Sequence, residues 1–282
     1  MGKKYELKAN KSENLRTFLA SNIPMLTVAK ADLLIKCGEV RVNGVKSKSN
    51  AVLQSGDAVS IFVPDELNKG AVNVNTVYDD ENIVIFDKPK RMAYDMLPQL
   101  YDAPLFGVHR LDTNTTGLIV FAKTESALTA LSDAFRDRKV KKVYEAVVLP
   151  APKADSATLT AYTKLLHDRN LALVSDKQKP GYKTMITEYT VMQRIGDAAV
   201  LRVFPHTGRT HQIRAHLGFI GCPIIGEHKY GTRGGAVSGA PDTQMLAAVE
   251  LTFSGLKGKL QYLNEKTFTV DSGFDLAFLH NA

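Results

Sequence analysis

Apolar residues recur along the N-terminal part of the chain at two spacings, one typical of helices and the other of strands. Gly38 follows a short helical stretch, as glycine does at helix ends. Asn43 and Gly44 form a strong hairpin-turn signal between alternating segments. The elements expected, in order, are a helix at 15–19, a helix at 31–37, a strand at 40–42 and a strand at 59–63. Residues 13–64 are therefore predicted to be a compact domain of two helices followed by a small sheet.

The remainder of the chain is rich in predicted strands and contains few helices. Residues 1–12 are expected to form a basic tail, and the turn formers and charges of residues 65–73 indicate a linker. The segment 231–239 is expected to be a flexible loop, since no strand-then-helix context makes it a phosphate cradle. Further elements are predicted as strands at 84–86, 118–122, 142–149 and 200–204 and as helices at 124–138 and 209–219. The pattern predicts an α+β protein with a second, larger domain over residues 74–282.

Composition narrows the class of partner. The formal net charge of +7 favours polyanions, of which nucleic acid is the commonest. The two cysteines, Cys37 and Cys222, lie far apart and fit reduced thiols in a cytosol better than a disulfide framework. No apolar run approaches the roughly 18 residues of a membrane span, and the basic N-terminus lacks the apolar core of a secretory signal. A cytoplasmic protein without a membrane partner is expected.

Three segments place unusual polar groups beside predicted strands. They are His109–Asp112, Lys142–Ala146 and the stretch 206–216. Taken singly, Asp112 fits a turn-capping residue, Tyr144 a core tyrosine and Arg214 a charge on a helix surface better than a catalytic role. Together the three segments favour a functional site, because the third places many hydrogen-bond donors within about two helical turns. These donors are Arg209, His211, Gln212, Arg214 and His216. Such a helix is expected to face an anion or a buried carboxylate.

Other chemistries fit these segments poorly. His206, His211 and His216 are spaced by five residues, which does not align them on one helix face, and no acid or cysteine completes a ligand set. A Gly-x-Ser-x-Gly elbow is absent, so a serine-hydrolase triad is not indicated. Paired glycosidase carboxylates would need a second acid near Asp112, where only Glu145 is available. No metal site is predicted.

The three segments together resemble the RluA-type pseudouridine synthases. That family reads His-Arg-Leu-Asp, two variable residues, Thr-Ser-Gly and an apolar strand, and this chain has HRLDTNTTGLIVF with Thr116 in place of the serine. The stretch 142–146 resembles Lys-x-Tyr-x-Ala, and TGRTHQIRAHLGFIGCPIIGEHKYG resembles the third motif with Glu227 in place of aspartate. The resemblance spans about residues 74–255, with Arg91 and Ala247 at positions where glycine and histidine are usual.

The N-terminal stretch LTVAKADLLIKCGEVRVNGVKSKSNAVLQSGDAVSI resembles the S-four-type RNA-binding domain, an αα-then-β module. Basic residues crowd around the second helix and the hairpin of this module. They are expected to form an RNA-facing edge and include Lys30, Lys36, Arg41 and Lys46.

The resemblance implies a fold and a reaction. The fold is a mixed, mostly antiparallel catalytic sheet with flanking helices. The reaction isomerises uridine in RNA to pseudouridine, without a cofactor or metal. Asp112 is the implied catalytic carboxylate, which attacks the sugar or the base or removes a sugar proton, and Arg214 is its implied cationic partner. Tyr144 is expected to stack on uracil and to assist the final proton removal, Arg110 to fill the space of the flipped base, and His109 to hold the loop.

The substrate is expected to be structured RNA, with ribosomal RNA favoured over transfer RNA. We expect Arg209, His211 and Gln212 to contact this RNA. A monomer is expected. Two other classes stay open at this point: a non-catalytic RNA-binding protein in which Asp112 is structural, and a nucleoside hydrolase that would release free base.

Overall fold

The computed structural model describes residues 3–24, 26–36, 38–47, 49–63, 74–101, 103–231 and 239–280. The expected linker at 65–73 and most of the expected loop at 231–239 lie outside these ranges. The chain divides into two compact units. Unit 1 comprises Met1–Asn75 and Arg91–Pro104, and unit 2 comprises Thr76–Lys90 and Leu105–Ala282. Residues 91–104 therefore belong to unit 1, whereas we expected one uninterrupted catalytic domain from residue 74 to 282.

Unit 1 contains the helices and strands that the N-terminal pattern predicts. Its elements are β1 (Lys3–Lys8), β2 (Glu13–Asn14), α1 (Leu15–Asn22), α2 (Val28–Lys36), β3 (Val40–Val42), β4 (Val45–Lys46), β5 (Val52–Leu53), β6 (Ala58–Val63) and the 3-10 helix η1 (Tyr94–Leu100). Helix α1 packs against α2, and Leu15, Phe18 and Leu19 are buried as their spacing predicts. Gly38 ends α2 in a left-handed conformation, with φ of 74°.

The prediction of a basic tail at residues 1–12 is wrong. Residues Lys3–Lys8 form β1, which pairs antiparallel with β6 at the edge of a sheet ordered β1-β6-β3-β4. Tyr5 and Leu7 are half-buried on one face of this strand, while its lysines are exposed. Charged residues are frequent on edge strands because they discourage further pairing, which explains why the segment reads as a tail.

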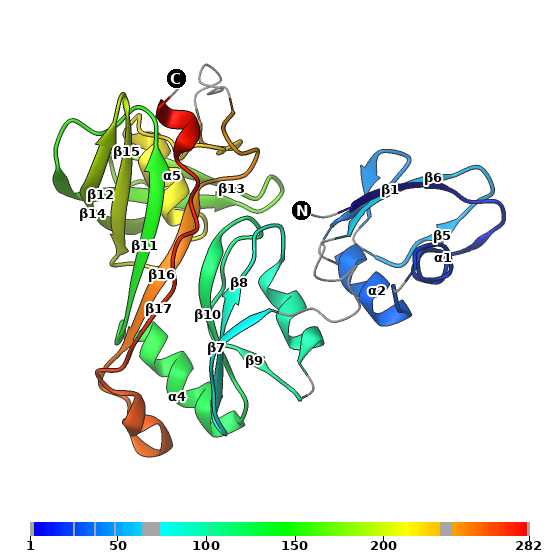
Figure 1. Ribbon diagram of the computed structural model, residues 1–282, viewed down its shortest axis with the longest axis horizontal. Coiled ribbons are helices and arrows are strands. Elements are labelled where there is room, and N and C mark those ends of the chain that lie inside the picture. The colour runs from blue at the N-terminus through cyan, green and yellow to red at the C-terminus, as the bar shows by residue number, and fades with distance from the viewer. Residues whose placement is uncertain are drawn as a thin grey trace. The chain divides into compact units, whose positions relative to one another are not determined.

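Unit 2 is built on one large sheet (Figure 1). Its strands are β7 (Asn75–Asp79), β8 (Ile83–Lys88), β9 (Phe106–Gly107), β10 (Thr116–Ala122), β11 (Val140–Val148), β12 (Ser156–Leu166), β13 (Leu171–Ser175), β14 (Lys183–Ile195), β15 (Ala198–Pro205), β16 (Leu246–Phe253) and β17 (Thr267–Thr269). Its helices are α4 (Glu125–Arg136), α5 (Gln212–Phe219) and the 3-10 helices η2 (Gly258–Leu263) and η3 (Ala277–His280). The strand order is β13-β12-β14-β15-β11-β16-β10-β8-β7, with β17 beside β16 and β9 beside β10.

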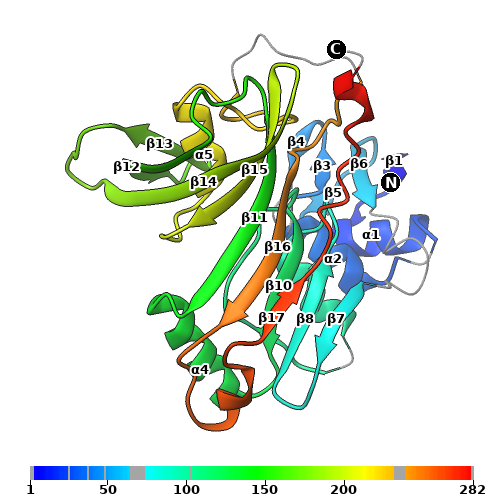
Figure 2. The same ribbon diagram turned by 60° about the vertical axis from the view of Figure 1, so that its left-hand side comes forward.

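The sheet is mixed and mostly antiparallel, which confirms the expected fold class. Among the described strands, only β10 and β16 pair in parallel. Figure 2 shows β11, β16 and β10 running side by side along the middle of the unit. Residues far apart in sequence, near 112, 144 and 246, are thereby brought together around neighbouring strands.

Helices cover parts of this sheet through apolar stripes. Helix α4 begins at the N-cap Thr124, whose hydroxyl accepts from the amide of Ala127. It packs Leu131 against the cluster that holds Leu118 and Val120 of β10. Helix α5 packs Ile213 and Leu217 against the cluster formed by β11 and β15. No described helix is long and apolar enough to cross a membrane.

Candidate active site

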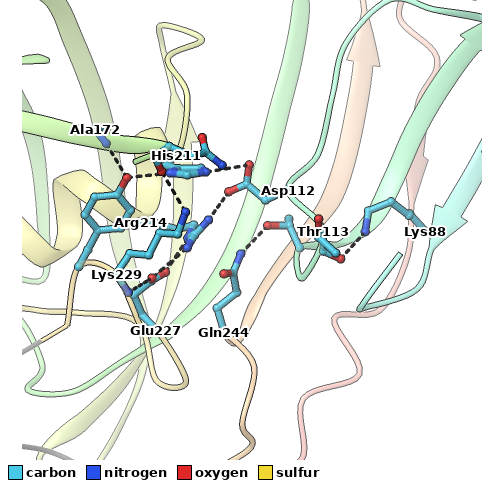
Figure 3. A network of polar contacts seen from close by, with 12 residues as sticks. Lys88, Asp112, Thr113, Ala172, His211, Arg214, Glu227, Lys229 and Gln244 are labelled. Carbon is cyan, nitrogen blue, oxygen red and sulfur yellow. Dashed lines mark hydrogen bonds and ion pairs between the residues drawn. The ribbon is translucent and has the colours of Figure 1, made fainter. Parts of the chain in front are cut away.

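Asp112 lies in the loop between β9 and β10, and two buried side chains pin this loop (Figure 3). The ammonium of Lys88, at the end of β8, donates to the carbonyl oxygen of Thr113 at 3.1 Å. The amide of Gln244 donates to the hydroxyl of Thr115 at 2.8 Å. Burial lowers the pKa of Lys88 to about 7, while the charge of Asp112 acts in the opposite direction. The loop is therefore fixed on both sides of the Asp112 carboxylate.

Gly117 lies at the start of β10, just after the loop of Asp112. It has φ of +99°, and a Cβ at this position would meet the carbonyl oxygen of Ala248 at 2.1 Å. The parallel pairing of β10 with β16 brings these backbones together. Only glycine allows this approach, and it sets the point at which the loop of Asp112 enters the buried strand.

Arg214 of α5 binds two carboxylates with one guanidinium. Its Nη1 donates to Oδ2 of Asp112 at 2.7 Å, while Nε and Nη2 donate to the two oxygens of Glu227 at 2.5 and 2.9 Å. Burial works against its charge, but the bonds to Glu227 and the charge of Asp112 outweigh burial and raise its pKa. The guanidinium is planar and is held by two bonds to Glu227, so its third bond fixes the direction of the Asp112 carboxylate. A lysine ammonium lacks this geometry.

His211 lies on the other side of the same carboxylate. Its Nε2 is 3.9 Å from Oδ1 of Asp112, and its Nδ1 is 2.7 Å from the hydroxyl of Tyr230. That hydroxyl also accepts from the amide of Ala172, so the Tyr230 oxygen is fixed between β13 and the ring of His211. Burial lowers the pKa of His211 to about 4, so its ring is neutral near pH 7.

The prediction that a helix starts near Arg209 is wrong. Helix α5 begins at Gln212, and His211 has a left-handed conformation with φ of 54°. His211 and Arg214 therefore do not share a helix face. They still meet at Asp112, because the turn before the helix redirects the imidazole.

Tyr144 of β11 is the third member of the cluster. A register shift between Val143 and Tyr144 interrupts the pairing of β11 with β16 at this residue. Burial, and next the charge of Asp112, raise the pKa of the phenol, so its hydroxyl stays protonated at neutral pH. The ring and the carboxylate border the same cavity.

This cavity has a volume of about 410 Å³. Its lining includes eight residues singled out from the sequence: His109, Arg110, Asp112, Tyr144, Arg209, His211, Gln212 and Arg214. Arg110 is exposed at its edge. The ring of His109 stacks on Phe135 at 4.5 Å, and its Nε2 accepts from the amide of Val120 at 3.0 Å. His109 thus ties the loop of Asp112 to β10.

Gln212 cannot contact RNA through its amide, contrary to our expectation. Its oxygen accepts from the hydroxyl of Thr207 and the amide of Arg209, and its nitrogen donates to Ile186 and Thr187. All four hydrogen-bonding positions of the group are used. Gln212 instead fixes the loop that leads into α5. Arg209 donates from Nε to the carbonyl oxygen of Thr184, and its side chain borders the cavity.

The basic residues predicted in the N-terminal module lie in unit 1. Lys36 forms an ion pair with Asp32 at 2.7 Å, and the guanidinium of Arg41 donates to the carbonyl oxygen of Gly44 at 3.1 Å. Burial raises the pKa of Glu39, and the charges of Lys46, Arg91 and Arg41 act against it, in that order. Lys30 is half-buried in α2.

Sequence reasoning overlooked three residues of the site. Lys88 and Gln244 hold the loop, and Tyr230 orients His211 and lies 5.6 Å from the Arg214 guanidinium. Only Lys88 gave a signal in the sequence. It ends an apolar strand, and burying a lysine there costs free energy unless its ammonium is bonded. Gln244 and Tyr230 gave no local signal, because Thr115 lies 129 residues from Gln244, and Ala172 and His211 lie 58 and 19 residues from Tyr230.

A carboxylate bonded to an arginine thus borders, together with a tyrosine, a cavity within the size range of small-ligand sites. The family model for RNA pseudouridylate synthase matches residues 82–218. An uncharacterized RNA pseudouridine synthase of Aquifex aeolicus is 32% identical, over 80% of this chain and 79% of its own length. The chain belongs to the RNA pseudouridine synthase family.

Two other comparisons agree with this assignment. Ribosomal large subunit pseudouridine synthase C of Vibrio parahaemolyticus is 29% identical, over 78% of this chain and 77% of its own. The structure of human RNA pseudouridylate synthase domain containing 4 is 24% identical, with a TM-score of 0.59, and the match covers 75% of this chain and 92% of that one. This last likeness shows the fold. The chain is an RNA pseudouridine synthase, and RNA is its substrate.

Proposed function

We propose that the chain isomerises uridines of ribosomal RNA and that Asp112 is its catalytic carboxylate. The observation that carries the proposal is the 2.7 Å bond between Arg214 and Asp112 inside the 410 Å³ cavity that Tyr144 also lines. The guanidinium fixes the direction in which the carboxylate points. Relatives named as ribosomal large subunit pseudouridine synthases support ribosomal RNA as the substrate.

The reaction breaks the bond between N1 of uracil and C1′ of ribose and forms a bond between C5 and C1′. No atom is lost and no electron is transferred to another molecule, because the proton on C5 leaves and one is returned to N1. Asp112 acts by attack on the sugar or the base or by removal of a sugar proton. Tyr144 offers a ring face for stacking. Its hydroxyl keeps its proton, so it serves the last proton transfer as a relay rather than as a free phenolate.

A uridine inside folded RNA must leave its stack to reach this cavity. Arg110, exposed at the cavity edge, is the side chain we assign to the vacated space. His109 acts as the anchor of that loop through Val120 and Phe135. His211 stays neutral and orients the carboxylate, and Arg209 contacts RNA at the cavity wall.

Unit 1 supplies an RNA-binding arm of the S-four type under this proposal. Helices α1 and α2 are followed by strands β3 to β6, and this order supports the assignment. We assign phosphate contacts to Lys30, Lys36, Arg41 and Lys46. A full-length variant in which Lys36, Arg41 and Lys46 become glutamine is expected to bind structured ribosomal RNA more weakly, with a smaller salt dependence. An unchanged affinity and salt dependence would remove unit 1 from RNA binding.

The proposal also includes that the enzyme is a monomer. A cytoplasmic location follows from a ribosomal substrate. Mass measurement by light scattering with and without RNA tests the first statement. A stable dimer in both conditions contradicts it.

Chemical mapping of pseudouridine in cells that lack the chain tests the function. Specific sites in ribosomal RNA are expected to disappear and to return with the wild-type chain but not with Asp112→Asn. Loss of sites only in transfer RNA would overturn the ribosomal substrate. Full restoration by Asp112→Asn would overturn the catalytic role of Asp112. Purified Asp112→Asn is expected to retain RNA binding, which separates catalysis from affinity.

A further inference from the structure

Three cavities of unit 2 meet at Gly208 and Arg209, and the catalytic cavity is the middle one. On one side lies a groove of about 770 Å³, here called the α4–β15 groove, lined by Phe135, Arg136, Arg138, Val140–Lys142, Glu188 and Phe204–Arg209. On the other side lies a groove of about 420 Å³, here called the β12–β13 groove, lined by Thr163–Leu165, His167, Ala172, Gly181, Lys183 and Gly208–Thr210. Gly208 and Arg209 line all three cavities.

The α4–β15 groove is strongly basic. Its described lining contains five lysines and arginines and one acid, Glu188, which is bonded to His206 at 2.8 Å. The acids that pair with its cations lie outside the lining: Asp133 and Asp137 bind Arg136, and Glu250 binds Lys141. The groove lining therefore holds the cations, while the acids that pair with two of them belong to residues outside the lining.

Lys142 occupies the junction between this groove and the catalytic cavity. It is half-buried, and no described carboxylate lies within ion-pair distance of its ammonium. A half-buried cation without an acid partner is costly unless an anion reaches it. Arg136 and Arg209 border the same two cavities. Three cations thus surround the exit of the cavity that receives the base.

The groove also contains an aromatic surface. The ring of Phe204 lines it, with the ammonium of Lys141 5.8 Å from the ring centre. Basic grooves with interleaved aromatic rings are the usual binding mode for single-stranded nucleic acid, because phosphates meet the cations and bases stack on the rings.

The β12–β13 groove carries the same sign of charge. Lys164, Lys183 and Arg209 line it together with His167, and its described lining contains no acid. Lys164 and Lys183 are exposed on neighbouring strands. Positive charge therefore flanks the catalytic cavity on both sides.

We propose that the two grooves hold the RNA backbone on either side of the target nucleotide, so that the enzyme recognises an unpaired segment several nucleotides long. Lys142, Arg136 and Arg209 contact the phosphates next to the target, and Phe204 stacks on a flanking base. The proposal rests on the proposed function for the identity of the target, but the grooves can be tested by binding alone.

The test compares three full-length double variants that each remove two positive charges. Arg138→Asn with Lys141→Gln alters the α4–β15 groove, and Lys164→Gln with Lys183→Gln alters the β12–β13 groove. Asparagine suits position 138, where φ is +60°. Lys153→Gln with Lys259→Gln is the control, because both residues are exposed and line none of the three cavities.

The probes are fluorescent single-stranded oligouridylates of two and ten residues. Each groove variant is expected to lose about tenfold in affinity for the ten-residue probe, and its slope of log affinity against log salt is expected to fall by roughly 1.4, which is two contacts at 0.7 each. The two-residue probe and the control variant are expected to change little. If the groove variants match the control on the ten-residue probe, the proposal is wrong. If only one of the two groove variants matches the control, RNA binding by that groove is overturned.

A second measurement separates this proposal from the proposed function. On ribosomal RNA that the wild type modifies, the groove variants are expected to raise KM more than they lower kcat. The wild-type protein could bind the probes through the grooves and still form no pseudouridine in ribosomal RNA. That result would overturn the ribosomal function and leave the RNA-binding role of the grooves intact. If the groove variants modify this RNA with the wild-type KM, the RNA-binding role of the grooves is overturned and the proposed function is left intact.

Discussion

Arg214 and Glu227 form a two-point ion pair in which the carboxylate side chain is fully buried. Burial raises the pKa of Glu227, but the bonds from Arg214 outweigh it, so the acid remains ionised. The third donor of Arg214 reaches Asp112. Glu227 therefore determines how the guanidinium lies, and through it where the Asp112 carboxylate points.

Glu227→Gln is expected to destabilise the protein and to lower kcat. Glutamine turns one N–H group toward the guanidinium, which leaves a buried cation with one acid fewer. Breaking a buried pair in this way costs about 3–5 kcal/mol. Urea unfolding measures the stability, and single-turnover formation of pseudouridine measures the rate. Glu227→Asp, which keeps the charge, is expected to recover part of both, and an equal loss in the two variants would contradict a role for the charge.

Tyr144→Phe is expected to separate the ring from the hydroxyl. The ring remains for stacking, so KM is expected to stay close to wild type, while kcat is expected to fall by about 100-fold or more if the hydroxyl relays a proton. Tyr144→Leu removes the flat face as well and is expected to raise KM. Steady-state kinetics on ribosomal RNA check both. Full activity of Tyr144→Phe would exclude the hydroxyl from the reaction.

The part of the site that could be predicted from sequence is local. The apolar run at 118–122 reads directly as a buried strand, and β10 indeed holds Asp112 at its entrance. Helix α4 could also be predicted from the sequence, because apolar residues recur at helical spacing after Thr124, which caps the helix. Periodicity reports such elements because each depends on residues within one or two turns.

The remainder depends on contacts between distant residues. The start of α5 is three residues later than predicted because His211 turns left-handed, where its Nδ1 lies 2.7 Å from the hydroxyl of Tyr230, 19 residues away. The donors of Gln212 suggested RNA contacts, and no local pattern shows that Thr207, Ile186 and Thr187 occupy its amide group. The placement of residues 91–104 in unit 1 likewise follows from packing that no periodicity encodes.

Gly117→Ala is expected to destabilise unit 2 by about 3 kcal/mol or more, because the new Cβ meets the carbonyl oxygen of Ala248 and φ is +99°. Gly196→Ala is the matched control. Gly196 also has a positive φ, of +55°, but a Cβ there meets nothing within 4 Å, so about 1 kcal/mol is expected. Urea unfolding of both variants measures the difference. Equal losses would show that the close approach of β10 to β16 contributes nothing.

Buried histidines make the protein sensitive to acid. Burial lowers the pKa of His216 to about 4, against an ordinary value of 6.5. The hydroxyl of Thr187 lies 2.9 Å from its Nδ1 and also accepts from the amide of Gln212. His211 and His109 have lowered pKa values for the same main reason.

His216→Gln is expected to reduce this sensitivity. The folded chain binds a proton at His216 less readily than the unfolded chain, so stability is complete above pH 6.5 and is lost as the pH falls toward 4. The loss from one such histidine is roughly 3 kcal/mol over this range. Urea unfolding at pH 7, 5.5 and 4.5 is expected to show a shallower decline for His216→Gln than for wild type. His228→Gln, at an exposed histidine, is expected to decline like the wild type. A decline in His216→Gln as steep as that of wild type would mean that His216 is not held neutral by the fold.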